Sequence, residues 1–493
     1  MAQPAKIEMS GISSYGDDAS RINTSDKVTN LFMDNSGYLR SRGGLSTITT
    51  DISGASLPSA QIDGLFYWAS KDLTMVVCGG SLYKMDENNF LTLIGTGLET
   101  NERASFAVVR TSSGVESLCV ANGGDMYIYD PTNVTWTNMY TTDNDAPRGV
   151  KKIVFLNGYL IALPANSNKF FFSQVGDPED WSALDFATAE ANADIIENIV
   201  IKGFYLYLFG TNTIEVWYND GATPFIRLDG GLIENGTASP FSVAKVEDKL
   251  LFLDNKRRIC SVEGQSAYQV ISTNIDKYLQ SINNVEDAYA FPIQHQGRVF
   301  YCITFPTTSR SGWDGSSSLG ITFLYDMYNQ QIFEWAEWST GNAEYGAFPV
   351  FCECYASLQQ RQILGKNEEG KLYELDTTIY KDEGNPLRVL WQSGFLDFGI
   401  LNKKRLRKMR WRQTSGTSTV PSLITFNYRV DGQSDWDATR ETSLTTGSSS
   451  LNQFHSQINN LRIARIFQFQ MVGSSNAPYC IGDVTLEIDI MGS

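Results

Sequence analysis

A short pattern of strand-forming residues recurs along the chain and limits the folds that it can adopt. The fullest copy, Lys202–Gly221, predicts two strands, Phe204–Phe209 and Thr213–Tyr218, joined by a turn at Gly210–Asn212. Every residue of the first strand is apolar or aromatic, whereas a strand at the surface alternates apolar with polar residues. This stretch therefore predicts a hairpin whose first strand is buried on both faces.

Related copies mark six further points of the chain. Three share the pattern G-x-(L/M)-Y-x-x-D and three are looser. They begin at Gly80, Gly124 and Gly370, and at Gly158, Asp248 and Gly297. Together with Gly203 they are about 45 residues apart, except for a short interval after Gly124 and a long one after Gly297. Short strands at this period indicate a β-propeller, in which each repeat forms one four-stranded sheet. A large β-sandwich with irregularly spaced hairpins is the alternative.

The chain is long enough for more than one domain, since its 493 residues exceed a single ordinary domain. We place the propeller at residues 59–385. After residue 385 the period stops and a run of longer strands follows, which predicts a second, smaller, β-sandwich-like domain at 386–493. Residues 1–58 are polar and are interpreted as an arm that orders on a partner, with a tail as the alternative.

An acidic excursion at 176–198 interrupts the third repeat. It holds seven carboxylates between Asp177 and Glu197, and its alanines favour a short helix. A solvated loop is the expected reading, because the D-x-D-x-D-G spacing of a calcium loop is absent.

Charge and cysteine usage limit the environment and the partners. With 39 basic and 55 acidic residues the net charge is −16, so the chain as a whole has no attraction for phosphate backbones. The seven cysteines are odd in number and widely spaced, which favours buried thiols in a reducing compartment. The N-terminal residues do not form a signal peptide and no apolar run spans a membrane, so we expect synthesis in the cytoplasm and no membrane insertion.

The sequence contains no pattern typical of a catalytic or metal-binding site. The two histidines, His295 and His455, fall in different predicted domains, which argues against a catalytic triad and a multi-histidine metal site. Cys352 and Cys354 read as thiols of one strand. The segment Gly365–Lys371 imitates a phosphate-binding loop, but Leu372 follows it and a strand replaces the helix, so a hairpin turn is predicted. No catalytic residue, cofactor or metal is expected.

One strongly basic strand stands out in the second domain. As a strand it alternates between two mixed faces, so we expect that it is not fully buried within one subunit. It is either an edge strand protected by charge or a contact surface for an acidic neighbouring subunit or a phosphate backbone. The candidate contact residues are Lys403, Lys404, Arg405, Arg407, Lys408, Arg410 and Arg412.

Three stretches together resemble the tail hub (nozzle) proteins of short-tailed phages, the group that includes the packaged-DNA stabilisation protein. The first is Asn35–Ser41. The second runs from the excursion, through Asp177–Trp181 and Asp194–Ile196, into Phe209–Trp217 with its Gly-x-x-Thr-Ile-Glu motif. The third is Tyr428–Gly432, followed by Leu461–Arg465. They span nearly the whole chain in the order expected of that family.

The resemblance implies a propeller, with six blades favoured over seven, and a platform domain built from the N-terminal arm and the C-terminal strands. It also implies a virion protein of the tail: a homohexameric ring below the portal adaptor that retains packaged double-stranded DNA and later conducts it out with weak, non-specific contact. A tail fibre or tailspike and a tail needle or plug are the further partners. The alternative from a different functional class is a propeller that binds or hydrolyses carbohydrate.

Overall fold

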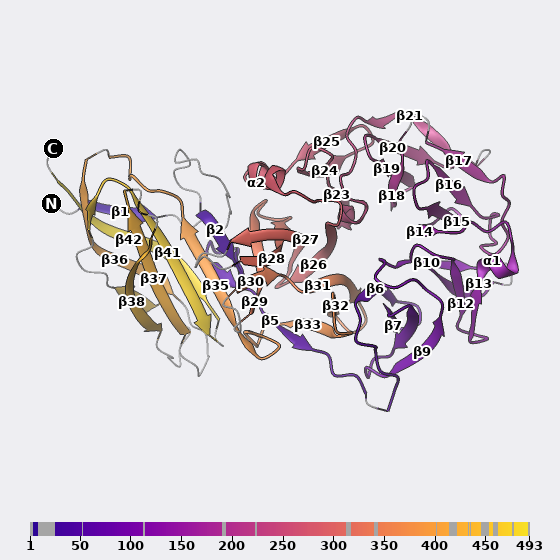
Figure 1. Ribbon diagram of the computed structural model, residues 1–493, viewed down its shortest axis with the longest axis horizontal. Helices are drawn as coiled ribbons and strands as arrows, with labels where there is room; N and C mark the ends of the chain where they lie inside the picture. The colour runs from indigo at the N-terminus through magenta and orange to yellow at the C-terminus, as the bar shows by residue number, and fades with distance from the viewer. Residues whose placement is uncertain are drawn as a thin grey trace.

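The computed structural model describes residues 3–7, 25–51, 53–111, 114–189, 194–221, 224–311, 317–339, 344–400, 402–413, 422–431, 433, 435–444, 453–456, 462–475 and 478–491. Two bodies are visible in this part of the chain (Figure 1): a ring of blades and a smaller two-layered β-structure, the platform. The predicted all-β propeller with a platform domain is confirmed. Its division at residues 58 and 385 stays a prediction.

In the described part of the chain, seven blades form the ring, six of them as separate four-stranded sheets and one as the first four strands of a larger sheet. Blade 1 contains β6 (Ile62–Trp68), β7 (Leu73–Cys78), β8 (Ser81–Met85) and β9 (Leu91–Thr96). Blade 2 contains β10 (Ser105–Arg110), β11 (Glu116–Ala121), β12 (Tyr127–Asp130) and β13 (Thr135–Asn138). Blade 3 contains β14 (Val150–Leu156), β15 (Tyr159–Pro164), β16 (Lys169–Phe172) and β17 (Phe186–Thr188). Blade 4 contains β18 (Ile196–Lys202), β19 (Tyr205–Gly210), β20 (Ile214–Tyr218) and β21 (Ile226–Ile233).

The remaining blades complete the circle. Blade 5 contains β22 (Ala244–Val246), β23 (Lys249–Leu253), β24 (Ile259–Glu263) and β25 (Ala267–Val270). Blade 6 contains β26 (Tyr289–His295), β27 (Arg298–Ser311), β28 (Ser317–Asp326) and β29 (Ile332–Ser339). Blade 7 contains β31 (Val350–Ala356), β32 (Arg361–Lys366), β33 (Leu372–Asp376) and, from the N-terminal arm, β5 (Gly44–Thr47). The helical segments between strands are short: α1 (Met139–Thr142), α2 (Asp276–Ser281) and the 3-10 turn η1 (Pro240–Ser242).

The sequence repeat had one mark in each blade, but not always at the same place. Gly80, Gly124 and Gly370 precede the third strand of their blades, whereas the other four marks precede the second strand. The change of position between blades 2 and 3 shortens one interval, and the change back between blades 6 and 7, together with the long β27–β28 hairpin, lengthens another. The blade number is therefore seven, not the favoured six.

Local predictions for the central hairpin and the acidic excursion have different outcomes. The predicted strand pair is β19 and β20, and Leu206–Gly210 are buried, but Phe204 lies in the turn and is 78% exposed.

The described part of the excursion contains no helix. Phe186–Thr188 instead forms β17 on the outer edge of blade 3, where the Phe186 and Phe171 rings are 5.8 Å apart. Residues 190–193 lie outside the described part of the chain.

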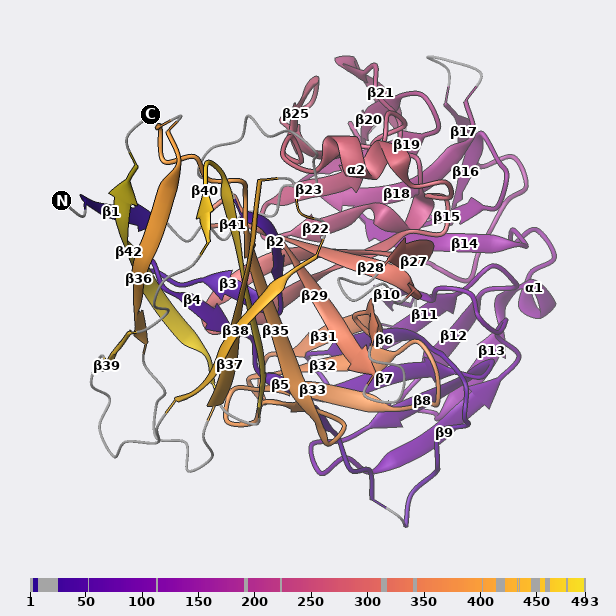
Figure 2. The ribbon, with the colours of Figure 1, turned by 60° about the vertical axis from the view of Figure 1, so that its left-hand side comes forward.

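The platform is a sandwich of two sheets (Figure 2). One sheet has the order β3 (Leu31–Met33), β4 (Leu39–Ser41), β42 (Cys480–Ile490), β36 (Lys404–Gln413) and β39 (Gln453–Ser456), with β1 (Gln3–Ile7) paired to β42 and β40 (Ile463–Ala464) to β36. The other has the order β2 (Ser25–Thr29), β35 (Asn385–Ser393), β41 (Phe467–Ser475), β37 (Ser422–Val430) and β38 (Asp437–Leu444). Between them, the Trp411 and Phe426 rings lie 4.4 Å apart.

The platform and the propeller share a sheet and a core. Strand β2 pairs with β29 of blade 6 on one side and with β35 on the other, so an eleven-stranded sheet runs from the propeller into the platform. Short strands β30 (Glu344–Ala347) and β34 (Lys381–Asp382) extend it. One apolar cluster includes Trp335 of blade 6 as well as Trp411 of the platform. We therefore expect the two bodies to behave as one unit.

A buried polar network fixes the N-terminal arm at this junction. The Arg42 side chain is fully buried and donates to Asp382 at 2.9 Å and to Asn30 Oδ1 at 2.9 Å. Asn30 Nδ2 in turn donates to the carbonyls of Ala336 and Arg388, at 3.0 and 2.8 Å. These contacts place Asn30 and Arg42 of the arm within one subunit, whereas the expectation that the arm orders on a partner stays a prediction. Residues 8–24 lie outside the described part.

Candidate functional site: the charged face of β36 and the axial cavity

The basic strand β36 lies inside a sheet, not at an edge. It pairs along its length with β42 on one side, and with β39 and β40 on the other. The interpretation as a protected edge strand is therefore wrong. Its charges need another explanation, because an interior strand has no free backbone edge to protect.

A β-bulge separates the apolar and basic side chains of β36 onto opposite faces. The ladder to β42 shifts between Leu406 and Lys408, so that Leu406, Met409 and Trp411 all point into the sandwich core. Arg405, Arg407 and Arg410 are exposed on the outer face. The expected mixture on both faces is wrong, because regular alternation does not include the extra residue that a bulge inserts.

The outer face of β36 is only partly neutralised by its neighbour β42. Arg407 forms an ion pair with Asp489, and Arg410 pairs with Glu487 at 2.8 Å. Among the described residues, no carboxylate pairs with the three other outer cations, Lys403, Arg405 and Lys408. Exposed ion pairs of this kind contribute about 0–1 kcal/mol each to stability, so they restrain the two arginine side chains only weakly.

Two of the seven candidate contact residues do not belong to this described outer face. Lys404 is fully buried, and its Nζ donates to the carbonyl of Arg465 at 2.7 Å. Burial lowers the pKa of Lys404, as expected for an ammonium group taken out of water. Lys404 is therefore a structural residue of the platform. The side chain of Arg412 lies outside the described part.

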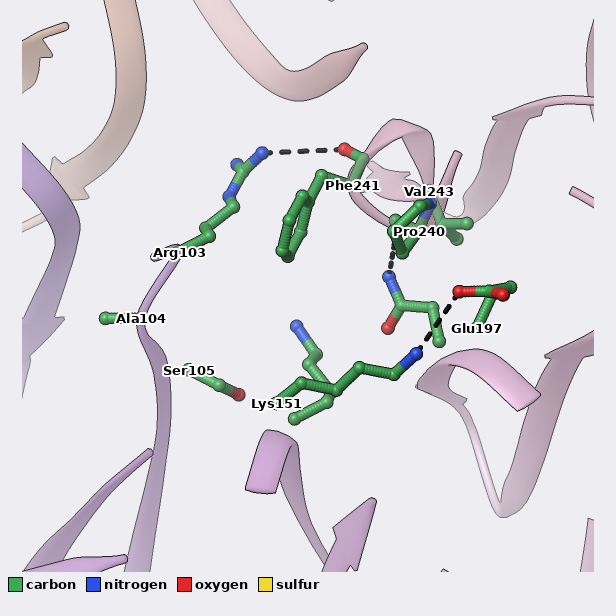
Figure 3. A pocket seen from close by; sticks show the side chains of 10 residues that line it. Arg103, Ala104, Ser105, Lys151, Glu197, Pro240, Phe241 and Val243 are labelled. Atoms are coloured by element: carbon green, nitrogen blue, oxygen red, sulfur yellow. Dashed lines mark hydrogen bonds and ion pairs between the residues drawn. The ribbon is translucent and has the colours of Figure 1, made fainter. Parts of the chain in front are cut away.

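A small cavity of about 70 Å³ lies on the axis of the propeller, where blades 2, 3 and 4 meet the η1 turn. Its lining is Arg103, Ala104, Ser105, Lys151, Lys152, Glu197, Asn198, Pro240, Phe241 and Val243. Figure 3 shows Lys151 and Glu197 joined by an ion pair of 3.2 Å, with Arg103 donating to the Phe241 carbonyl across the cavity. Arg103 also donates to the carbonyl of Ala290 in blade 6, at 2.9 Å, and so bridges the axis.

Bulges in the innermost strands bring charged side chains to this axis. The first strands of blades 1, 3, 4 and 7 each shift register once near their start, beside Asp63, Lys151, Glu197 and Phe351. In β14 the shift lets two successive lysines, Lys151 and Lys152, line the same cavity. None of these residues was predicted from the sequence. The available signal was a pair of adjacent lysines within an otherwise apolar strand.

Burial changes the ionisation of several axial groups. It lowers the pKa of Lys152 to about 8, with a further contribution from the Arg103 guanidinium. It raises the pKa of Glu353 and of Asp63 to about 7. Each shift has the sign expected when a charged form loses its hydration.

The remaining sequence candidates have structural roles. His295 is buried, and its Nε2 accepts a hydrogen bond from the Gly43 amide at 3.1 Å. Cys352 and Cys354 are buried, free thiols of β31, as predicted. The loop at 365–371 is the predicted hairpin turn between β32 and β33. No group of three or more histidine, cysteine or acidic side chains within the described residues is arranged to hold a metal ion.

Glycoside hydrolysis needs two carboxyl groups that flank the scissile bond. The axial cavity offers one, Glu197, and it is engaged by Lys151. This arrangement gives no support to a glycosidase centre there.

Among the described residues no helix is long and apolar enough to cross a membrane.

Comparison with known proteins identifies the family. A family model described as "Bacteriophage P22 Gp10, beta-propeller" matches residues 18–380, well over half of the chain. The chain belongs to this family. The resemblance to phage tail hub proteins is thereby confirmed, and the Gp10 family is one of phage structural proteins linked to the stabilisation of packaged DNA. No curated protein matches the chain.

Solved structures similar to this Gp10-family chain are distant. The dihydro-haem d1 dehydrogenase NirN has 11% identity and a TM-score of 0.39, with 65% of this chain and 62% of NirN covered. PorZ of the type-IX secretion system of Porphyromonas gingivalis has 11% identity and a TM-score of 0.36, with 74% and 44% covered. BBS1N, from its complex with ARL6DN, has 8% identity and a TM-score of 0.38, with 68% and 98% covered. The chain spans about three fifths of the first of these.

Proposed function

We propose that this Gp10-family protein is the hub of a phage tail: a homohexameric ring below the portal adaptor that retains packaged DNA after head filling and forms part of the ejection channel. Family membership supports the placement in a virion tail. The outer face of β36 supports ring formation and carries the structural argument. The protein acts by assembly and not by catalysis.

The basic face is suited to an acidic protein partner. It presents Lys403, Arg405 and Lys408 without carboxylate partners among the described residues, on a chain whose net charge is −16. A second copy of such a chain supplies abundant acidic surface, and complementary charge steers association and sets the orientation of the partners. A contact between two different patches of identical subunits generates a closed ring when its rotation closes. We assign the face to this contact, or to the adaptor ring above.

The path of the DNA follows from the closed propeller axis. Arg103 reaches across the axis to the Ala290 carbonyl, and the cavity beside it measures only about 70 Å³. A DNA duplex needs an opening wider than its own major groove, which is about 12 Å wide. A duplex cannot pass through the propeller of one subunit. The channel of the proposed hub therefore runs between subunits, at the centre of the ring.

The overall charge suits a channel that must release its cargo. Proteins that grip several phosphates bind DNA with high affinity at low salt, which opposes rapid ejection. A ring of subunits that each carry −16 avoids such a grip, so contact with the passing DNA is weak and non-specific. Tail fibres or tailspikes and a needle or plug complete the proposed set of partners.

Light scattering of the purified protein, with and without the adaptor ring, tests the proposal. We expect a mass of six times 54.9 kDa, either alone or once adaptor is added. A protein that stays monomeric under both conditions contradicts the hub.

A pair of matched double variants tests the assigned face. Arg405→Thr with Lys408→Thr keeps strand-forming residues in β36 and should abolish ring formation while the monomer stays folded. Lys245→Thr with Lys256→Thr makes the same change in net charge on the exposed surface of the propeller, and should assemble normally. If both variants form rings equally well, β36 does not mediate the subunit contact.

A further inference from the structure

The axial cavity has more positive than negative charge in its lining. Arg103, Lys151 and Lys152 face a single carboxylate, Glu197, which is already paired with Lys151. Lys152 has no hydrogen-bond or ion-pair partner among the described residues. Two cations, Lys152 and Arg103, are therefore left close enough to each other to repel, in a site where burial weakens their hydration.

Two backbone carbonyls hold the Arg103 guanidinium in place but leave part of it available to donate a hydrogen bond to a ligand. Its two terminal nitrogens donate to the carbonyls of Phe241 and Ala290, and its guanidinium lies over the Phe351 ring at 5.6 Å. Carbonyl partners neutralise none of its charge, and within the described part of the chain its Nε has no hydrogen-bond partner. Glu353 influences Arg103 electrostatically, but burial raises the pKa of Glu353 to about 7 and it does not line the cavity.

The lining also contains a buried hydrogen-bond acceptor, Asn198 Oδ1, to which no described residue donates. Asn198 is only 5% exposed; its Nδ2 donates to the Pro240 carbonyl at 2.5 Å, while its Oδ1 accepts no hydrogen bond from any described residue. A buried acceptor left without a donor loses its hydration and gains nothing in return, which destabilises the folded chain. The cavity thus combines two unneutralised cations with one acceptor that needs an O–H or N–H group.

We propose that this cavity binds one small oxyanion of the monohydrogen phosphate class. Its charged oxygens accept hydrogen bonds from Lys152 and Arg103, and its hydroxyl group donates to Asn198 Oδ1. Sulfate at neutral pH carries no hydroxyl group and leaves Asn198 unsatisfied, so the site prefers phosphate. A volume of about 70 Å³ admits a free anion but not a nucleotide. The bound anion joins blades 2, 3 and 4 at the axis, and this role is independent of the proposed hub function.

Binding is measured on the full chain by equilibrium dialysis with labelled inorganic phosphate, and by thermal unfolding in phosphate, sulfate or chloride at matched ionic strength. We expect one phosphate per chain, with a saturable rise in the unfolding temperature that grows with ligand concentration. Sulfate should bind at least tenfold more weakly. Adenosine monophosphate should not bind, which separates free phosphate from the phosphate group of a larger molecule.

Lys152→Met removes the ammonium group and keeps the length of the side chain. Without phosphate we expect this variant to be as stable as the wild type or more so, because an unpaired buried charge is lost. With phosphate the order should reverse, and the affinity should fall about tenfold or more, as expected for the loss of a charge-assisted hydrogen bond. Lys256→Met, on the exposed surface, is the matched control and should bind like the wild type.

Two outcomes overturn the proposal. One is the absence of saturable phosphate binding to the folded wild-type chain at millimolar concentration, which means that the cavity holds water only. The other is equal phosphate affinity of the wild type and Lys152→Met, which places any bound anion elsewhere. Neither outcome bears on ring formation, so failure here is distinguishable from failure of the hub.

Discussion

Single residues explain why the motif shared with the tail hub family has its particular sequence. Asp194 is buried and accepts hydrogen bonds from the Asn212 and Thr213 amides, both at 2.8 Å, and from the Thr211 hydroxyl. Burial by itself raises the pKa of Asp194, but these hydrogen bonds outweigh it and hold the pKa below its usual value. A Cβ at Gly210 would lie 2.5 Å from Asp194 Oδ2, so only glycine fits beside the carboxylate.

The G-x-(L/M)-Y-x-x-D pattern has a similar origin. Its terminal aspartates accept backbone amides two residues later: Asp86 from Asn88 at 2.9 Å, Asp130 from Thr132 at 2.7 Å, and Asp376 from Thr378 at 2.7 Å. Such aspartates close a turn by imitating a backbone carbonyl. The repeat was visible in the sequence because each copy of this turn needs the same chemistry.

His295 makes stability depend on pH in a predictable direction. Burial, with a smaller contribution from Arg42, lowers its pKa to about 3, against an ordinary value of 6.5. Between pH 6.5 and 3 the unfolded chain therefore binds more protons, so the free energy of unfolding falls as the pH decreases, by up to about 1.4 kcal/mol per pH unit from this group. Below pH 6.5, His295→Gln, which keeps an acceptor for the Gly43 amide, should lose stability less steeply than the wild type.

Denaturant unfolding at pH 7, 6, 5 and 4 measures this difference. Other carboxylates change the absolute curves, but they are common to both proteins and cancel in the comparison. Parallel curves for the wild type and His295→Gln would show that His295 is not held neutral.

At the scale of one element, the bulge in β36 decides which side chains reach the core. Leu406 pairs with Ile488 and Lys408 with Glu487, so Arg407 is the extra residue in the ladder. Without it the strand would alternate regularly as far as Trp411, where the ladder shifts a second time, and would still direct Leu406 and Met409 inward. Arg410 cannot be removed in the same way, because Trp411 follows it and its ring packs inward, 4.4 Å from the Phe426 ring.

Two single-residue deletions test whether Arg407, and not Arg410, is the extra residue of the bulge. Deletion of Arg407 should leave a folded platform with a small change in stability. Deletion of Arg410 removes a residue of the same type from the same strand, but it turns Trp411 outward and should cost about 3–5 kcal/mol. Urea unfolding followed by tryptophan fluorescence measures both. Equal destabilisation by the two deletions would contradict the assigned bulge.

At the scale of the whole molecule, the propeller and the platform depend on each other. The ring closes through β5, which comes from the N-terminal arm and pairs with β33 in blade 7. The same arm supplies β2 to the eleven-stranded sheet and Arg42 to the buried pair with Asp382. Removing one partner of a buried pair leaves an uncompensated charge, so both halves should lose stability together.

Calorimetry of the isolated subunit tests this coupling. We expect one cooperative transition for the wild type, and one transition at lower temperature for Arg42→Met, because the arm contacts both bodies. Two resolved transitions in the wild type, or a shift of only one part in Arg42→Met, would show that the propeller and platform unfold independently.

The sequence by itself determined the repeating unit, the all-β class and the phage tail family. These depend on local chemistry: apolar strands, aspartate turns and glycines that each act within a few residues. Tertiary structure alone decided the blade number, the closure by β5 and the faces of β36. A strand from residue 44 pairs with one at residue 376, and one inserted residue turns a mixed strand into a two-faced one. The axial cavity has the same origin, because its charges come from three blades and meet only when the ring closes.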